Sequence, residues 1–100
     1  MLYIVKIALL QDKFPVEKAE EYFDQHRAWF KKYFDKGNFL ILGPMPDLDH
    51  TGLILAQAET RAELDQILAE DVYQPFGGAT YEVNEFKAVM VADNIKAYQG

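Results

Sequence analysis

His26 is the side chain of this sequence with the clearest capacity for chemistry, because an imidazole titrates near neutrality and can give or take a proton. It stands in the middle of the aromatic stretch EEYFDQHRAWFKKYF, residues 20–34. At about 100° per residue in a helix, the residues within roughly 60° of it on the helical wheel are Ala19, Tyr22, Phe23, Trp29, Phe30 and Tyr33. We therefore expect an amphipathic helix that turns His26 toward the core or a pocket.

Two interpretations of His26 follow from this position. In the first, it is a core residue whose ring nitrogens bond nearby backbone or hydroxyl groups. In the second, it is a general acid or base, and a carboxylate partner fixes its tautomer. The candidate partner is Asp71, in AEDVYQPFGG (residues 69–78), because a carboxylate at the C-terminal end of a helix opposes the helix dipole. The alternative for Asp71 is a turn residue in a solvated helix exit, and Glu70 is a weaker competitor for the pairing.

A metal site is not expected. Asp47, Asp49 and His50 in PDLDHTG are residue types that metals accept, but their spacing matches no established metal loop, and ordinary turn formation explains them. Gly77 and Gly78 lack the strand-to-helix setting of a phosphate-binding loop and are interpreted as turn glycines. We predict no metal and no cofactor.

Composition narrows the possible partners. A chain of 100 residues with 50% hydrophobic content is long enough for one packed domain, residues 1–100, and too short for two. The net charge of −6 argues against nucleic acid, which requires clustered Lys and Arg. The apolar run MLYIVKIALL contains Lys6 and is far shorter than a membrane span. There is no cysteine, which is compatible with a cytoplasmic location and removes disulfides and thiolate chemistry.

The elements that must position His26 and Asp71 follow the order βαββαβ. They are a strand at 1–10, a helix entered at Pro15 and closed by Gly37, strands at 38–43 and 51–59, a helix after Thr60, and a strand at 80–91 with residues 91–100 as strand end and tail. Thr60 and Glu63 have the spacing of a capping box. This order predicts an α+β, ferredoxin-like fold, in which both helices lie on one face of an antiparallel sheet.

Such a sheet leaves its other face uncovered. The strand at 1–10 and residues 86–91 of the last strand carry apolar residues in both parities, so a monomer would expose a large apolar surface. A second copy of the chain is the simplest cover, and we predict a homodimer.

Several short motifs, taken in order, resemble those of the YCII-related (YciI-like) family. They are the helix histidine, Gly37 before the second strand, Gly43-Pro44 at its end, Gly52 opening the third strand, and an Asp-Pro-aromatic motif closing the second helix. The resemblance implies a dimeric ferredoxin-like α+β barrel and a catalytic pair that maps onto His26 and Asp71, with Tyr73 at the aromatic position. This sequence departs from the pattern at Val72, where the family usually has proline. The family includes a dehydrochlorinase that acts on chlorinated hydroxyquinols.

Two functions remain open. The leading hypothesis is an enzyme of lyase, dehydrochlorinase or isomerase type, in which His26 moves a proton on a small cyclic or aromatic substrate and Asp71 orients the imidazole. The alternative is a non-catalytic dimeric module that binds a small ligand in the same pocket. For either function, the predicted pocket residues are Tyr22, Trp29, Phe30, Gly43, Pro44 and Tyr73.

Overall fold

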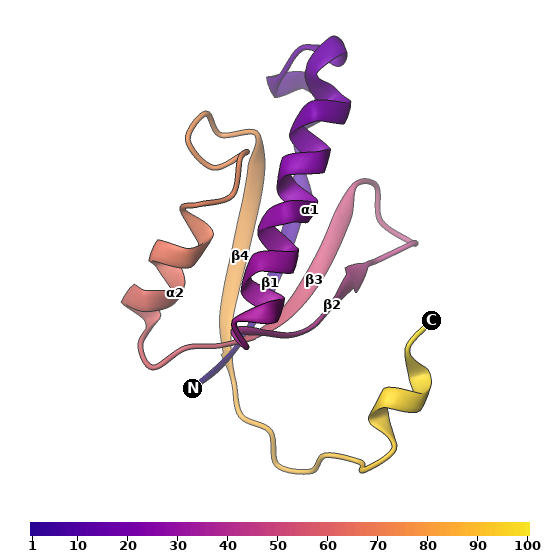
Figure 1. Cartoon of the computed structure of the whole chain (residues 1–100), viewed down its shortest axis with the longest axis vertical. Helices are drawn as coiled ribbons and strands as arrows, with labels where there is room; N and C mark the ends of the chain where they lie inside the picture. The colour runs from indigo at the N-terminus through magenta and orange to yellow at the C-terminus, as the bar shows by residue number, and fades with distance from the viewer.

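The fold is built on one four-stranded antiparallel sheet. The computed structural model describes all 100 residues and gives the strand order β2-β3-β1-β4. Both helices cover the same side of the sheet (Figure 1). The elements are the strands β1 (Leu2–Leu9), β2 (Phe39–Pro44), β3 (Thr51–Gln57) and β4 (Ala79–Phe86), and the helices α1 (Ala19–Asp35) and α2 (Arg61–Leu68). The predicted α+β ferredoxin-like arrangement is confirmed.

The first strand occupies the interior of the sheet, as its apolar sequence predicts. It pairs with β3 on one side and with β4 on the other, so both of its edges are hydrogen-bonded. Tyr3, Val5 and Ile7 are buried under the helices, while the alternate side chains face the other side and are half-buried. Lys6 belongs to that second, helix-free face, where it lies opposite Glu82 of β4. Its charge therefore does not interrupt the core.

The helix that carries His26 begins later than predicted. The sequence places its first turn at Pro15, but α1 starts at Ala19, and residues Val16–Lys18 form a separate 3-10 turn. Pro15 precedes that short turn with extended backbone, which its fixed φ of −64° allows. The other end agrees with the prediction, because the chain leaves the helix at Gly37 with a φ of +89°.

Hydrogen bonds fix the second helix near both of its ends. Thr60 Oγ1 accepts a hydrogen bond of 3.1 Å from the Glu63 amide, which is one half of the predicted capping box. The Glu63 carboxylate accepts its bond, of 3.0 Å, from the amide of Glu59 rather than from that of Thr60. The Trp29 indole N–H donates to the Ile67 carbonyl at 2.9 Å. This bond joins α1 directly to α2 and brings the last turn of α2 close to His26.

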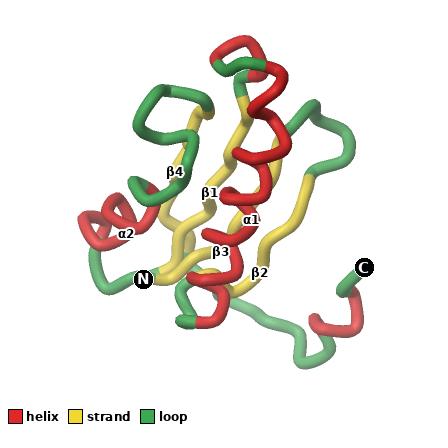
Figure 2. Tube along the Cα trace, turned by 45° about the horizontal axis from the view of Figure 1, so that its top comes forward, coloured by secondary structure: helices red, strands yellow, loops and turns green.

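The last strand is shorter than predicted. It ends at Phe86 rather than Val91, and the register gives the reason: Phe86 pairs with Leu2, the first residue of β1, so no backbone remains for later residues to bond. Residues 87–100 leave the sheet and turn once as a short 3-10 helix at Ile95–Tyr98 (Figure 2). No helix of the chain combines the length and the apolar character needed to cross a membrane.

Candidate active site

His26 and Asp71 meet at the centre of the helix-covered layer. His26 Nδ1 lies 2.6 Å from Asp71 Oδ1, and the two residues are only 4% and 1% exposed. They are also the only buried residues of this chain with ionisable or amide side chains outside the tyrosines. A pair this short and this well shielded from water interacts more strongly than an equivalent pair on the surface.

Tyr81 completes the set of groups that bind the Asp71 carboxylate. Its hydroxyl donates to Asp71 Oδ2 at 2.6 Å, so each carboxylate oxygen has its own donor. Burial raises the pKa of the Tyr81 hydroxyl above its ordinary value, and the hydrogen bond to Asp71 raises it further. Tyr81 therefore stays protonated and remains a donor across the whole neutral range.

These bonds define which nitrogen of His26 is available for chemistry. A carboxylate only accepts hydrogen bonds, so Nδ1 carries the hydrogen shared with Asp71. The other ring nitrogen, Nε2, makes no hydrogen bond within the protein. Every fully buried side-chain nitrogen of the chain does have a hydrogen-bond partner, so Nε2 is not fully buried and keeps some exposed surface. His26 also lines the main cavity of the molecule. Nε2 is thus the atom that can accept a proton from a molecule in that cavity.

Aromatic rings surround the imidazole on several sides. The ring centroid of His26 lies 4.3 Å from that of Phe30 and 5.1 Å from that of Tyr73, and it stacks on Trp29 at 5.7 Å. Burial raises the pKa of Tyr73 to about 12, with a smaller contribution from the charge of Asp71. The rings hold the imidazole in one orientation and limit the approach of water.

Asp71 is positioned by a tight turn that follows α2. The Asp71 amide donates to the Leu68 carbonyl at 3.2 Å, and its own carbonyl accepts from the Gln74 amide at 3.0 Å. Val72 therefore occupies the second position of the turn from Asp71 to Gln74, the position that proline favours. The turn that positions Asp71 therefore forms with valine at this position.

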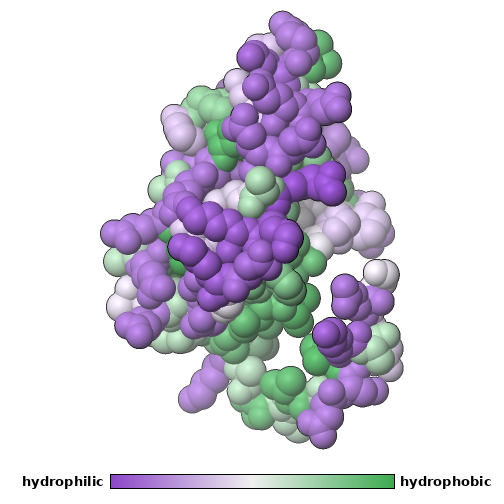
Figure 3. Space-filling model, in the orientation of Figure 1, coloured by the Kyte–Doolittle hydropathy of each residue, from purple (hydrophilic) through white to green (hydrophobic).

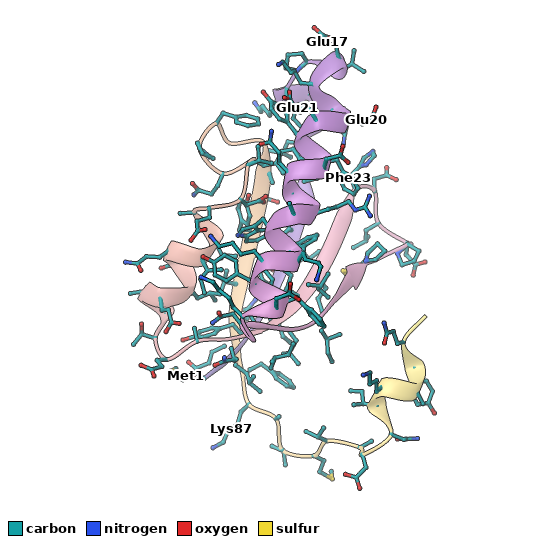
Figure 4. All side chains as sticks on the ribbon, viewed as in Figure 1. Met1, Glu17, Glu20, Glu21, Phe23 and Lys87 are labelled. Carbon is teal, nitrogen blue, oxygen red and sulfur yellow. The ribbon has the colours of Figure 1, made fainter.

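A cavity of about 720 Å³ opens beside the pair. It lies between α1 and the β2–β3 hairpin, and Glu20 and Phe23 mark the turns of α1 that border it (Figure 4). The hairpin supplies mainly apolar walls. Besides His26, the polar side chains of the lining are Gln11, Glu20, Arg27, His50 and Thr51. The lining that bears on function comprises Phe23, His26, Arg27, Phe30, Leu42, Gly43, Pro44, Leu48, His50, Ile54 and Tyr73.

The structure separates the predicted pocket residues into two groups. Phe30, Gly43, Pro44 and Tyr73 line the cavity together with His26. Tyr22 and Trp29 do not line it. Tyr22 packs instead against the rings of Phe14, Tyr73 and Phe76, and Trp29 stands behind His26 with its indole bonded to α2.

Sequence reasoning did not place Tyr81, Arg27 or His50 at the site, and it considered His50 only as part of the loop PDLDHTG. Tyr81 carried a usable signal, because it sits at an inward-facing position of a predicted strand, and a buried tyrosine hydroxyl needs a hydrogen-bond partner. Arg27 and His50 carried none, since their place at the cavity depends on how the β2–β3 hairpin folds over α1.

Glu70, the weaker competitor for His26, has other partners. Its carboxylate accepts hydrogen bonds from Lys32, at 2.7 Å, and from the Tyr33 hydroxyl. The bond from Lys32 is the main reason that the pKa of Glu70 is lowered, and the bond from Tyr33 adds to it. Glu70 thus links the end of α2 to the last turns of α1, and it does not line the cavity.

Comparison with known proteins gives one family and one informative fold neighbour. The structure resembles that of 5-chloro-2-hydroxyhydroquinone dehydrochlorinase from Burkholderia phenoliruptrix in complex with 2,5-dihydroxybenzoquinone, with a TM-score of 0.67 over 87% of this chain and 94% of that chain. At 14% identity, this likeness shows a shared fold. No curated protein matches the chain in sequence. The family model for the YCII-related domain matches residues 1–87, and the chain therefore belongs to the YCII-related family.

Proposed function

We propose that this protein is a small cofactor-independent enzyme that moves a proton on a small cyclic or aromatic substrate. One observation carries the proposal: His26 Nδ1 is bonded to Asp71 Oδ1 at 2.6 Å, while Nε2, free of protein partners, belongs to a residue of the cavity wall. This is the arrangement that an acid-base catalyst requires, because one nitrogen is fixed and the other is available. The reaction is of lyase, dehydrochlorinase or isomerase type.

The cavity suits a substrate of this size and chemistry. Its volume of about 720 Å³ falls within the usual range for small-molecule sites, which is roughly 300–1,000 Å³. Phe23 and Phe30 on α1 and Leu42 and Ile54 on the sheet offer apolar surface to a flat ring. The same walls displace water from the reacting atoms, which strengthens the interaction between His26 and its partners.

The proton transfer can be followed atom by atom. His26 Nε2 takes a proton from a hydroxyl or carbon of the substrate, and the imidazolium that forms is stabilised by Asp71. In a lyase, the electron pair left behind forms a new double bond, and the leaving group departs from the neighbouring carbon with its own pair. In an isomerase, the proton returns from Nε2 to a different atom. Tyr81 holds the carboxylate in place throughout.

Arg27 can bind the substrate in either reaction. It follows His26 in α1, lines the cavity, and makes no ion pair with any carboxylate of the chain. Its guanidinium is therefore available to a substrate oxygen that gains negative charge as the proton leaves. The dehydrochlorinase with the same fold was solved with a quinone ligand, and this supports oxygen-bearing rings as the first compounds to test.

We also infer that the working form is a homodimer. On the helix-free face, Leu55 of β3 lies opposite Ile4 of β1 on one side and Ile41 of the edge strand β2 on the other, and Leu2 precedes Ile4 on the same face. A second sheet packed on that face would bury it. Sedimentation velocity at micromolar concentration should give a dimer, and Ile4→Glu should give a monomer; a monomeric wild type contradicts the inference.

A chain without cysteine suits a reducing compartment, so we propose the cytoplasm as its location.

The function is tested with a panel of cyclic hydroxylated and chlorinated compounds that begins with 5-chloro-2-hydroxyhydroquinone. Chloride release and exchange of ring protons for deuterium report turnover, and calorimetry reports binding. We expect at least one compound to be turned over, and His26→Gln to bind it while losing about 10²–10⁴-fold in kcat. His50→Gln is the matched comparison, because His50 is the other histidine of the chain and lines the same cavity without a carboxylate partner, so its loss should affect KM rather than kcat.

The outcomes separate the two hypotheses. A loss of kcat in His26→Gln without a comparable loss of kcat in His50→Gln supports the enzyme. Tight binding by the wild type with no turnover of any bound compound supports the non-catalytic binding module instead. Turnover that survives His26→Gln contradicts the assignment of His26.

A further inference from the structure

The C-terminal segment, residues 87–100, stands away from the rest of the molecule. We call it the arm. It begins at Lys87, directly after β4, and runs beneath the sheet without returning to it (Figure 1, Figure 4). Every residue of the arm is exposed, and its backbone hydrogen bonds from Ala92 to Gln99 are all internal. The arm also lies outside the residues that match the YCII-related domain, apart from Lys87.

The arm is too apolar to be a simple solvated tail. Val89, Met90, Val91 and Tyr98 are 82%, 91%, 68% and 81% exposed, and Ile95 is half-exposed. Large apolar side chains gathered on one exposed segment usually mark a surface that binds another protein. We therefore expect the apolar side chains of the arm to contact another protein surface, because the sheet of their own chain does not cover them.

An apolar patch on the body matches the arm. Phe34, in the last turn of α1, and Leu40 and Ile41, at the start of β2, are 55%, 43% and 47% exposed. Figure 3 shows apolar atoms gathered at the lower end of the body, facing the side on which the arm lies. The β2 strand is also an edge of the sheet, so its outer backbone groups are not bonded to a neighbouring strand. We call these three residues the edge patch.

The net charges of the arm and of the rest of the chain, residues 1–86, are opposite in sign. The arm contains Lys87, Lys96 and Asp93, which give it a side-chain charge of +1. Because the whole chain has a net charge of −6, residues 1–86 have a net charge of −7. An arm of opposite sign is attracted to this body rather than repelled by it.

We propose that the arm of one chain packs on the edge patch of a second copy, and that the two chains exchange arms reciprocally. Each copy has one arm and one edge patch, so a pair related by a two-fold axis covers both arms and both patches. Val89, Met90 and Val91 lie along the partner's Leu40 and Ile41, where an added extended segment can also bond the open edge of β2. The exchange rests on the proposed homodimer and adds to it a contact at the β2 edge of the helix-free face, where Ile41 lies.

The test uses the full chain and a matched pair of double variants. Val89→Asp with Val91→Asp adds two negative charges at apolar positions of the arm, whereas Asn94→Asp with Gln99→Asp adds the same charge at polar positions. Sedimentation across a dilution series measures the dimer dissociation constant. The first pair should raise it at least tenfold, and the second pair should change it less than threefold.

Cross-linking then identifies the contact. The chain has no cysteine, so Val91→Cys in one preparation and Ile41→Cys in another give single, unambiguous thiols. After the two preparations are mixed, a short bismaleimide should join position 91 of one chain to position 41 of the other.

The outcomes distinguish the arm from the dimer itself. A stable dimer that gives no such cross-link and responds equally to both double variants overturns the arm exchange and leaves the dimer standing. A wild-type monomer overturns both. A chain that carries both cysteines and cross-links within itself, even in excess wild-type chain, places the arm on its own body and also overturns the exchange.

Discussion

Tyr81 and His26 bind opposite oxygens of one carboxylate: the Tyr81 hydroxyl meets Asp71 Oδ2 and His26 Nδ1 meets Asp71 Oδ1, each at 2.6 Å. They come from β4 and α1, so the carboxylate joins the sheet to the helix layer. Asp71 is 1% exposed, and no water can replace a donor that is lost without entering the core.

The first prediction concerns Tyr81→Phe. Removing the hydroxyl leaves a buried carboxylate oxygen without a donor, which should lower the free energy of unfolding by about 1–3 kcal/mol. Urea denaturation at neutral pH measures it. Tyr22→Phe is the control, because the Tyr22 ring is packed against other aromatics but its hydroxyl makes no side-chain hydrogen bond. Equal losses in the two variants would show that the bond to Asp71 contributes nothing.

Alkaline pH should destabilise the protein through two tyrosines. Burial raises the pKa of Tyr73 to about 12 and that of Tyr81 higher still, whereas both ionise near pH 10 in the unfolded chain. Above pH 10 the unfolded state loses protons that the folded state keeps, so unfolding becomes more favourable as the pH rises. Their contribution is fully present below pH 10 and is lost as the pH rises toward and beyond 12.

Tyrosinate absorbance and urea denaturation together check this expectation. Of the six tyrosines, some should titrate only as the chain unfolds, and Tyr73→Phe and Tyr81→Phe should each remove one of these late groups. Stability that stays constant between pH 9 and pH 11, or six tyrosines that titrate together in the folded protein, would be incompatible with both assignments.

Val72→Pro should be neutral or stabilising, despite its position beside Asp71. The Val72 amide donates no backbone hydrogen bond, and the residue sits second in the turn from Asp71 to Gln74. Proline at such a position restricts the unfolded chain and stabilises by about 0.4–1 kcal/mol when the backbone fits. Thermal unfolding measures the change, and a loss of more than 1 kcal/mol would mean that the valine backbone differs from the turn that proline favours.

Much of the fold could be predicted because local signals agreed with the tertiary structure. The apolar sequence of residues 2–9 indicated an interior strand, and the spacing of Thr60 and Glu63 located the start of α2. The end of β4 could not be predicted locally, since residues 87–91 are as apolar as a strand. What stops the strand at Phe86 is the start of its neighbour at Leu2.

The candidate site, like the fold, could be predicted from the sequence only where local signals determine it. The aromatic stripe placed His26 inward, and the unfavourable helix-end position of Asp71 indicated that it needed a partner. Tyr81 reaches Asp71 only because β4 pairs with β1 in one register, which places Tyr81 opposite Ile7. Tyr22 and Phe23 were indistinguishable on the helical wheel, but the hairpin after β2 leaves Phe23 at the cavity and Tyr22 among other rings.

The central claim is that His26 and Asp71 act as one unit in proton transfer, and a double-mutant cycle tests it most directly. The measurement is kcat/KM for the wild type, His26→Gln, Asp71→Asn and the double variant, on the panel compound that the wild type turns over fastest. The account predicts a loss of about 10²–10⁴-fold for His26→Gln, a large loss for Asp71→Asn, and a double variant within about tenfold of the worse single variant. Losses that multiply in the double variant, or an Asp71→Asn enzyme with wild-type kcat/KM, would contradict it.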